Sequence, residues 1–148
     1  MQEKRTCCFF GHRCIFANIP TLYTEIERHI TQYDVVTFYI SRYGDFDEKS
    51  VDVLKELQQK YPHIEIIYVL AYLPGKSTEG YSPEWYSSSI YPAGLESVPQ
   101  RFAITHRNCW IVEESDYVIC YVELGYCGAY DAVRYAKKLG KQVVNLAD

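Results

Sequence analysis

The chain lacks any apolar run that approaches the length of a membrane span, and its first residues lack the charged-then-apolar pattern of a secretory signal. It begins instead with the polar segment Met1-Gln2-Glu3-Lys4-Arg5. These absences argue against an export signal and a membrane anchor. We therefore predict a cytoplasmic protein with no membrane partner.

Paired cysteine spacing is also absent. Cys7 and Cys120 fall in apolar segments, where a free cysteine behaves as a small hydrophobic residue. The other four of the six cysteines show no Cys-x-x-Cys spacing, which makes a zinc site improbable. We predict reduced thiols, no metal and no cofactor.

An excess of positive charge is missing as well, because 15 Lys and Arg face 19 Asp and Glu, for a net charge of −4. Nonspecific nucleic-acid binding needs a basic surface, so we predict no nucleic-acid partner. A length of 148 residues with 48% hydrophobic residues fits one domain over residues 1–148. The 15 tyrosines are consistent with an aromatic-lined pocket, with an oligomer interface, or with compositional habit alone.

Apolar runs and helical periodicities alternate along the chain. Five β-branched or aromatic runs predict strands: Thr6–Phe10, Val35–Ile40, Ile64–Leu70, Tyr117–Val122 and Gln142–Leu146. Helical spacing predicts helices at about residues 20–33, 45–61, 100–115 and 129–139. Residues 71–99 are rich in Tyr, Ser, Pro and Gly and are expected to be irregular, with a short helix around residues 84–89. The alternation predicts an α/β fold, a doubly wound, mostly parallel five-stranded sheet with helices on both faces.

Three predicted loops leave strand ends and are expected to meet at the carboxyl rim of the sheet, where ligands of open α/β sheets bind. They are Gly11-His12-Arg13, residues 41–47 and residues 123–128. Glycines let backbone amides approach a ligand, and a glycine turn before a helix offers N–H donors to phosphate. The same residues are also compatible with ordinary turns that end strands, and short motifs of this kind carry little information alone.

Several segments taken together resemble the SLOG superfamily, and within it the YpsA-like (DUF1273) branch. They are Cys7 to Arg13, Phe38 to Asp47, Arg107-Asn108 with Ser115-Asp116, Gly128 to Ala136 and Gly140 to Leu146. The resemblance spans nearly the whole chain except the central segment. It implies a Rossmann-like fold with a pocket for a nucleotide or nucleotide-derived ligand. Relatives include cytokinin-activating phosphoribohydrolases and sensor domains proposed to bind nucleotide signals.

Two positions depart from the family pattern. Ser41-Arg42 stands where paired glycines are usual, and Cys127-Gly128-Ala129 stands where Gly-Gly-Thr is usual. Arg42 could itself bind an anion, and loss of the threonine hydroxyl removes one phosphate contact. Arg107 and Asn108 are candidates for the ligand rim, or else Arg107 pairs with a nearby acid and Asn108 with a loop carbonyl. The predicted ligand-binding residues are Gly11, His12, Arg13, Arg42, Gly44, Asp47, Arg107, Asn108, Gly125 and Gly128.

We predict binding of a nucleotide-derived small molecule, with a role as a sensor. The alternative is a phosphoribohydrolase-like enzyme that cleaves an N-glycosidic bond, because relatives carry an acid near Asp131. In that case Asp131 and Glu123 are the catalytic candidates, since a carboxylate stabilises positive charge on ribose. Asp131 also suits the dipole at the start of a helix, and we favour that structural role. The resemblance further implies a homodimer, for which the helix bearing Trp110 offers a surface.

Overall fold

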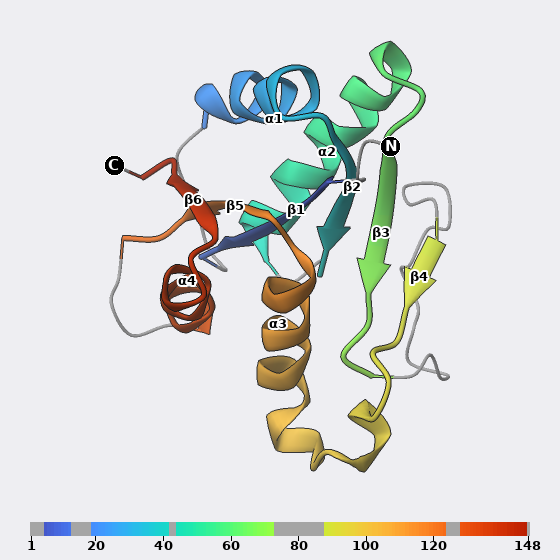
Figure 1. Ribbon diagram of the computed structural model, residues 1–148, viewed down its shortest axis with the longest axis vertical. Coiled ribbons are helices and arrows are strands. Elements are labelled where there is room, and N and C mark those ends of the chain that lie inside the picture. The colour runs from blue at the N-terminus through green and yellow to red at the C-terminus, as the bar shows by residue number, and fades with distance from the viewer. Residues whose placement is uncertain (1–4, 13–18, 42–43, 73–87, 124–127, 148) are drawn as a thin grey trace.

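A computed structural model describes residues 5–12, 19–41, 44–72, 88–123 and 128–147 (Figure 1). Its centre is a parallel sheet of six strands in the order β4-β3-β2-β1-β5-β6. The strands are β1 (Arg5–Gly11), β2 (Val35–Ile40), β3 (Glu65–Val69), β4 (Ser88–Ile90), β5 (Tyr117–Tyr121) and β6 (Gln142–Asn145). The predicted α/β fold with a parallel sheet is therefore confirmed.

The prediction of five strands is wrong, because β4 adds a sixth strand at one edge. Ser88, Ser89 and Ile90 pair in parallel with Ile67, Tyr68 and Val69 of β3. The predicted helix around residues 84–89 is therefore wrong at Ser88 and Ser89, while residues 84–87 lie outside the described part. Two serines and one isoleucine carry no strand pattern, so this strand depends on its pairing with β3 rather than on its own apolar face.

Within the described residues, four α-helices connect the strands: α1 (Thr21–Gln32), α2 (Asp45–Lys60), α3 (Ala103–Glu114) and α4 (Gly128–Lys138). Two short 3-10 helices, η2 (Leu95–Ser97) and η3 (Gln100–Phe102), precede α3, so the helix predicted over residues 100–115 begins with a tighter turn. Gly44 precedes α2 with φ +113°, a backbone conformation that favours glycine. None of the helices in the described part of the chain combines the length and apolarity needed to cross a bilayer.

The buried core divides into two clusters that use alternate residues of β1. Cys7 and Phe9 pack with α1 and α2 residues such as Ile26 and Leu54. Cys8 and Phe10 pack with residues of α3 and α4. Successive strand residues point to opposite faces of a sheet, so the two clusters lie on the two sides of β1. In Figure 1, β1 and β5 run between α1 and α2 above and α3 and α4 below, and β3 and β4 lie to the right.

The direction in which strands are added reverses between β1 and β5. The chain first builds β2, β3 and β4 on one side of β1, and then returns through α3 to place β5 and β6 on the other. Both neighbours of β1 run parallel to it. The carboxyl ends of β1 and β5 therefore lie at the point where the strand order reverses. This switch point is the usual place for a ligand in an open α/β sheet.

Candidate functional site

A cavity of about 340 Å³ lies at this switch point. Its volume is near the lower end of the roughly 300–1,000 Å³ typical of small-molecule sites. The lining comes from the ends of β1 and β2 and from the facing parts of α2, α3 and α4, and consists of Phe10, Gly11, His12, Ser41, Asp47, Ile104, Arg107, Asn108, Gly128 and Ala129. We call this the rim cavity.

The ends of β1 and β5 are tied together beside the rim cavity through His12. Its backbone N–H donates to the carbonyl of Tyr121 at 3.2 Å. Its ring Nε2 accepts the backbone N–H of Glu123 at 2.6 Å. Because Nε2 is an acceptor here, the ring proton is on Nδ1. These two bonds fix the start of the connection from β5 to α4.

Gly11 is required by close packing between β1 and α2. A Cβ built at Gly11 would overlap the Cβ and ring atoms of Phe46. Phe46 is fully buried and packs against the rings of Phe9 and Tyr121, with centroid distances of 6.4 Å in both cases. The phenyl ring cannot move aside without disturbing the core, so this position accepts only glycine.

A buried carboxylic acid, Asp47, stands in the first turn of α2. Asp47 is 5% exposed, and its Oδ2 accepts a hydrogen bond of 2.9 Å from the hydroxyl of Ser41, which follows β2. Burial raises the pKa of Asp47 to about 6, although the Ser41 hydrogen bond and the attraction of Arg107 both oppose that rise. The acid is therefore ionised in most molecules at neutral pH and protonated in most at pH 5.

The opposite wall of the rim cavity comes from one face of α3. Ile104, Arg107 and Asn108 are spaced i, i+3 and i+4, which places them together on a helix surface. Arg107 is 4% exposed, and its Nε and terminal nitrogen donate to Asn108 Oδ1 at 3.3 and 3.1 Å. The side chain thus places a buried guanidinium against the cavity, opposite Asp47. Arg107 therefore lines the cavity and attracts the Asp47 carboxylate, and its contact with a ligand stays a prediction.

The start of α4 completes the lining with Gly128 and Ala129. The first N–H groups of a helix have no partner within it and carry partial positive charge. Among the described residues, which exclude 124–127, no atom lies within 4 Å of a Cβ built at Gly128, in contrast to Gly11. Gly128 therefore leaves open space at a helix end that suits an anion.

Asn145 at the end of β6 supports the site and was not predicted from the sequence. Its side chain accepts the backbone N–H of Val122 at 3.1 Å and donates to the carbonyl of Val122 at 3.0 Å. It also accepts the N–H of Ala147 at 3.1 Å. The amide thus continues the pairing of β5 past its last residue. An asparagine as the last residue of an edge strand was the available signal.

The rim cavity brings together six of the ten predicted ligand-binding residues: Gly11, His12, Asp47, Arg107, Asn108 and Gly128. Gly44 is the N-cap of α2 and is not part of the lining. Arg13, Arg42 and Gly125 lie outside the described residues. Phe10, Ile104 and Ala129 supply apolar lining and were not among the predicted ligand-binding residues.

The two predicted catalytic carboxylates do not line the rim cavity. Asp131 lies in a separate surface hollow on α4 with Arg134, Tyr135, Lys137 and Lys138. Glu123 is exposed, and its carboxylate accepts a hydrogen bond of 3.4 Å from the hydroxyl of Tyr121. In the described part of the chain, no group of three or more His, Cys, Asp or Glu side chains is placed to hold a metal ion.

No family model and no curated protein matches this chain. Two solved structures have a similar fold. The molybdenum cofactor binding protein from the phototrophic bacterium Rippkaea orientalis is 19% identical, with a TM-score of 0.63 over 97% of this chain and 76% of that one. DNA processing protein A (DprA) from Streptococcus pneumoniae is 15% identical, with a TM-score of 0.64 over 95% of this chain. This chain spans about half the length of DprA, 49%.

These likenesses support a Rossmann-like fold, and membership of the SLOG superfamily stays a prediction from the sequence. At these identities the likeness concerns the fold alone. The YpsA-like branch stays a prediction from the sequence.

Proposed function

We propose that this chain binds a nucleotide or a nucleotide-derived small molecule in the rim cavity. The observation that carries the proposal is the buried Arg107 guanidinium facing the open space beside Gly128 at the start of α4. A guanidinium and helix N–H groups together suit phosphate. Phe10 and Ile104 offer apolar surface for a base or another flat group.

The volume of the rim cavity favours a compact ligand, such as a mononucleotide. A small-molecule ligand also agrees with one structural neighbour being a molybdenum cofactor binding protein. The YpsA-like branch, the sensor role, a cytoplasmic location and a homodimer belong to the same proposal and rest on the sequence.

A melting experiment with a panel of nucleotides tests the proposal. A ligand at one hundred times its Kd stabilises the fold by about 2.7 kcal/mol, which raises the Tm by several degrees. Arg107→Met removes the guanidinium and is expected to weaken binding at least tenfold. Gly128→Ala adds a methyl group where a phosphate would approach, so it also weakens binding without lowering the Tm of the free protein.

Lys138→Met is the matched control, because it removes one positive charge from the other end of α4, outside the rim cavity. It is expected to leave the ligand-induced shift unchanged. Absence of a shift with every nucleotide at millimolar concentration contradicts the proposal. Release of free base that is lost in Asp131→Asn or Glu123→Gln would instead establish the hydrolase.

A further inference from the structure

We propose that an anion enters the rim cavity together with a proton, and that Asp47 is the residue that takes up this proton. The inference rests on the proposed function, because it concerns the same cavity. It adds a regulatory property to that function: the site binds anions more tightly as the pH falls.

The geometry places a negative and a positive side chain in one small cavity. Asp47 and Arg107 are both at least 95% buried, and both line the space that the ligand would occupy. Water screens charges poorly in such a place, so an ionised Asp47 repels an incoming anion. It also attracts Arg107, the side chain that the anion needs. The ionised acid therefore competes with the ligand in two ways.

Protonation of Asp47 removes both effects. The carboxyl group becomes neutral, Arg107 keeps its charge, and the pair changes from balanced to net positive. Ser41 is compatible with both forms, because a hydroxyl donates to a carboxylate and accepts from a carboxylic acid. The hydrogen bond between Ser41 and Asp47 therefore accommodates the proton by reversing its direction.

The charged groups near Asp47 leave its pKa close enough to physiological pH for the carboxylate to take up a proton. Arg107 from α3 favours the ionised form, while Glu48 from α2 opposes it. Cys8 of β1 also interacts with Asp47, but burial raises the pKa of its thiol to about 12, so the thiol is neutral. With a pKa of about 6, Asp47 is protonated in about a tenth of molecules at pH 7. A bound anion raises the fraction of molecules in which Asp47 is protonated.

His12 is the second titratable group in the lining, and an imidazolium there would also favour anions at low pH. The experiment must therefore separate the two residues. Asp47→Asn keeps a side chain that accepts from Ser41 and cannot ionise. His12→Gln keeps an oxygen that accepts the Glu123 N–H and cannot become positive.

Inorganic sulfate is the probe, because its charge does not change between pH 5 and 9. Its Kd is measured by NMR titration of backbone amides from pH 5.5 to 8 at constant ionic strength. Uptake of one proton weakens binding by up to tenfold per pH unit above the pKa. We expect the unaltered protein to bind sulfate at least tenfold more weakly at pH 8 than at pH 6. Asp47→Asn is expected to change less than twofold and to bind tighter than the unaltered protein at pH 8.

His12→Gln is expected to retain the dependence on pH. If Asp47→Asn retains it and His12→Gln loses it, the proton goes to His12 and the proposal is wrong. A carboxyl ¹³C titration of Asp47 in the unaltered protein tests the same point without a variant. Sulfate is expected to move its midpoint to higher pH, and an unchanged midpoint overturns the proposal.

This test separates the two proposals. If sulfate and nucleotides bind in the rim cavity with no dependence on pH, the proton uptake is wrong and the proposed function stands. If neither binds at any pH, both fail.

Discussion

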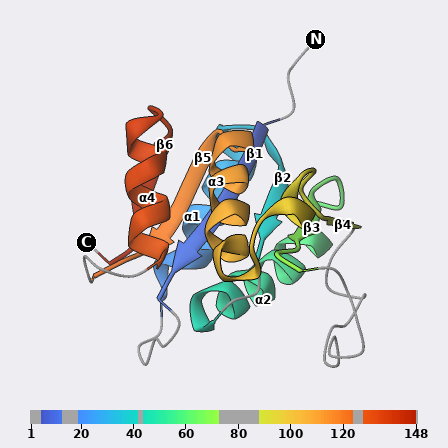
Figure 2. The same ribbon diagram turned by 90° about the horizontal axis from the view of Figure 1, so that it is seen from below.

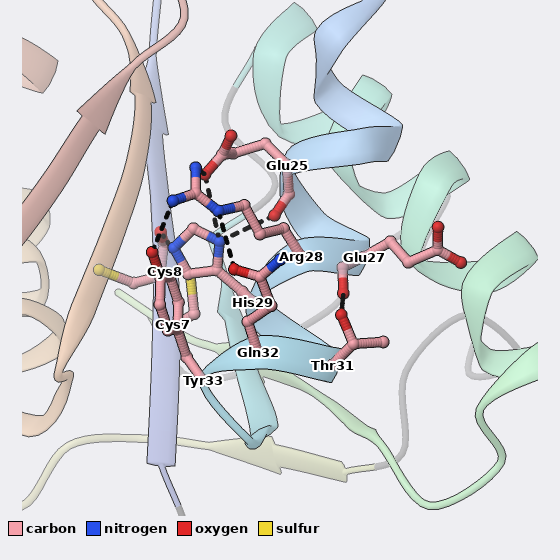
Figure 3. Close-up of polar contacts among 9 residues, drawn as sticks. All are labelled: Cys7, Cys8, Glu25, Glu27, Arg28, His29, Thr31, Gln32 and Tyr33. Carbon is pink, nitrogen blue, oxygen red and sulfur yellow. Dashed lines mark hydrogen bonds and ion pairs between the residues drawn. The ribbon is translucent and has the colours of Figure 1, made fainter.

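Two buried titratable side chains, Asp47 and His29, have contrasting surroundings: the first lines an open cavity, and the second is enclosed by packed side chains. Asp47 lines an open cavity with Ser41 and Arg107. His29 of α1 is 1% exposed and is enclosed by side chains. Its ring meets Tyr33 and Tyr117 edge-on, at centroid distances of 5.0 and 5.4 Å. Figure 3 shows the ring between α1 and β1, with its Nδ1 2.8 Å from the carbonyl oxygen of Glu25.

Burial disfavours the charged form of both groups, with different consequences at neutral pH. It lowers the pKa of His29, so this ring is neutral and its Nδ1–H donates to Glu25. It raises the pKa of Asp47 to about 6, which still leaves the acid mostly ionised at pH 7. The His29 ring is thus neutral and hydrogen-bonded, although the buried Oε1 of Glu25 beside it has no hydrogen-bond partner in the described part of the chain. The rim cavity instead holds a charge that destabilises the fold. Burial alone does not identify a site; a buried charge beside open space does.

The largest expected effect is a gain in stability from Asp47→Asn. The pKa of Asp47 is higher in the folded chain than in the unfolded chain. The stability that its protonated form gives the fold is therefore fully present below about pH 4 and is lost as the pH rises through 6. Asparagine stays neutral, so the variant should exceed the unaltered protein by about 1–3 kcal/mol at pH 7 in urea unfolding. The difference should vanish at pH 4.

Asp52→Asn is the matched control, since Asp52 is exposed on the same helix. It is expected to leave the free energy of unfolding unchanged at pH 7. Equal or lower stability of Asp47→Asn at pH 7 would contradict the contrast between the two regions.

A second prediction concerns the two glycines of the rim cavity. Gly11→Ala drives a methyl group into Phe46 and is expected to lower the free energy of unfolding by about 2 kcal/mol. Gly128→Ala meets open space and is expected to change it by less than about 0.5 kcal/mol. Thermal and urea unfolding of both variants measure the difference. Equal losses would show that both glycines serve packing.

The smallest expected effect lies in the His29 cluster and appears only in acid. The folded pKa of His29 is below its ordinary value, so the unfolded chain takes up the proton first. The contribution of His29 to the free energy of unfolding is therefore constant above about pH 6.5. Below that pH it decreases by at most about 1.4 kcal/mol per pH unit. His29→Gln should flatten this decrease between pH 6.5 and 5, while His106→Gln, at an exposed position, should not.

The architecture was largely predictable because the apolar runs at Thr6–Phe10, Val35–Ile40 and Tyr117–Val122 are each followed by a helical period. The strand at Val35–Ile40 was predicted with its observed bounds. β4 was missed because a Ser-Ser-Ile segment becomes a strand only through β3. Such tertiary pairing leaves no local pattern.

The candidate site was predictable where residues follow a strand end, as at Gly11 and His12. The site was less predictable where an interaction joins elements that are far apart in the sequence. The role of Ile104 follows from its position one turn before Arg107 and Asn108, and that of Asn145 from its amide reaching Val122. The sequence placed Asp131 near the anion site, but α4 directs it to another surface hollow.

Backbone-amide NMR with the nucleotide panel tests the central claim most directly. A binding nucleotide is expected to shift the signals of Gly11, His12, Arg107, Asn108 and Gly128 most, because these residues line one cavity. Shifts centred instead on the groove beside Trp110 and Cys109, or no shifts at all, would contradict it.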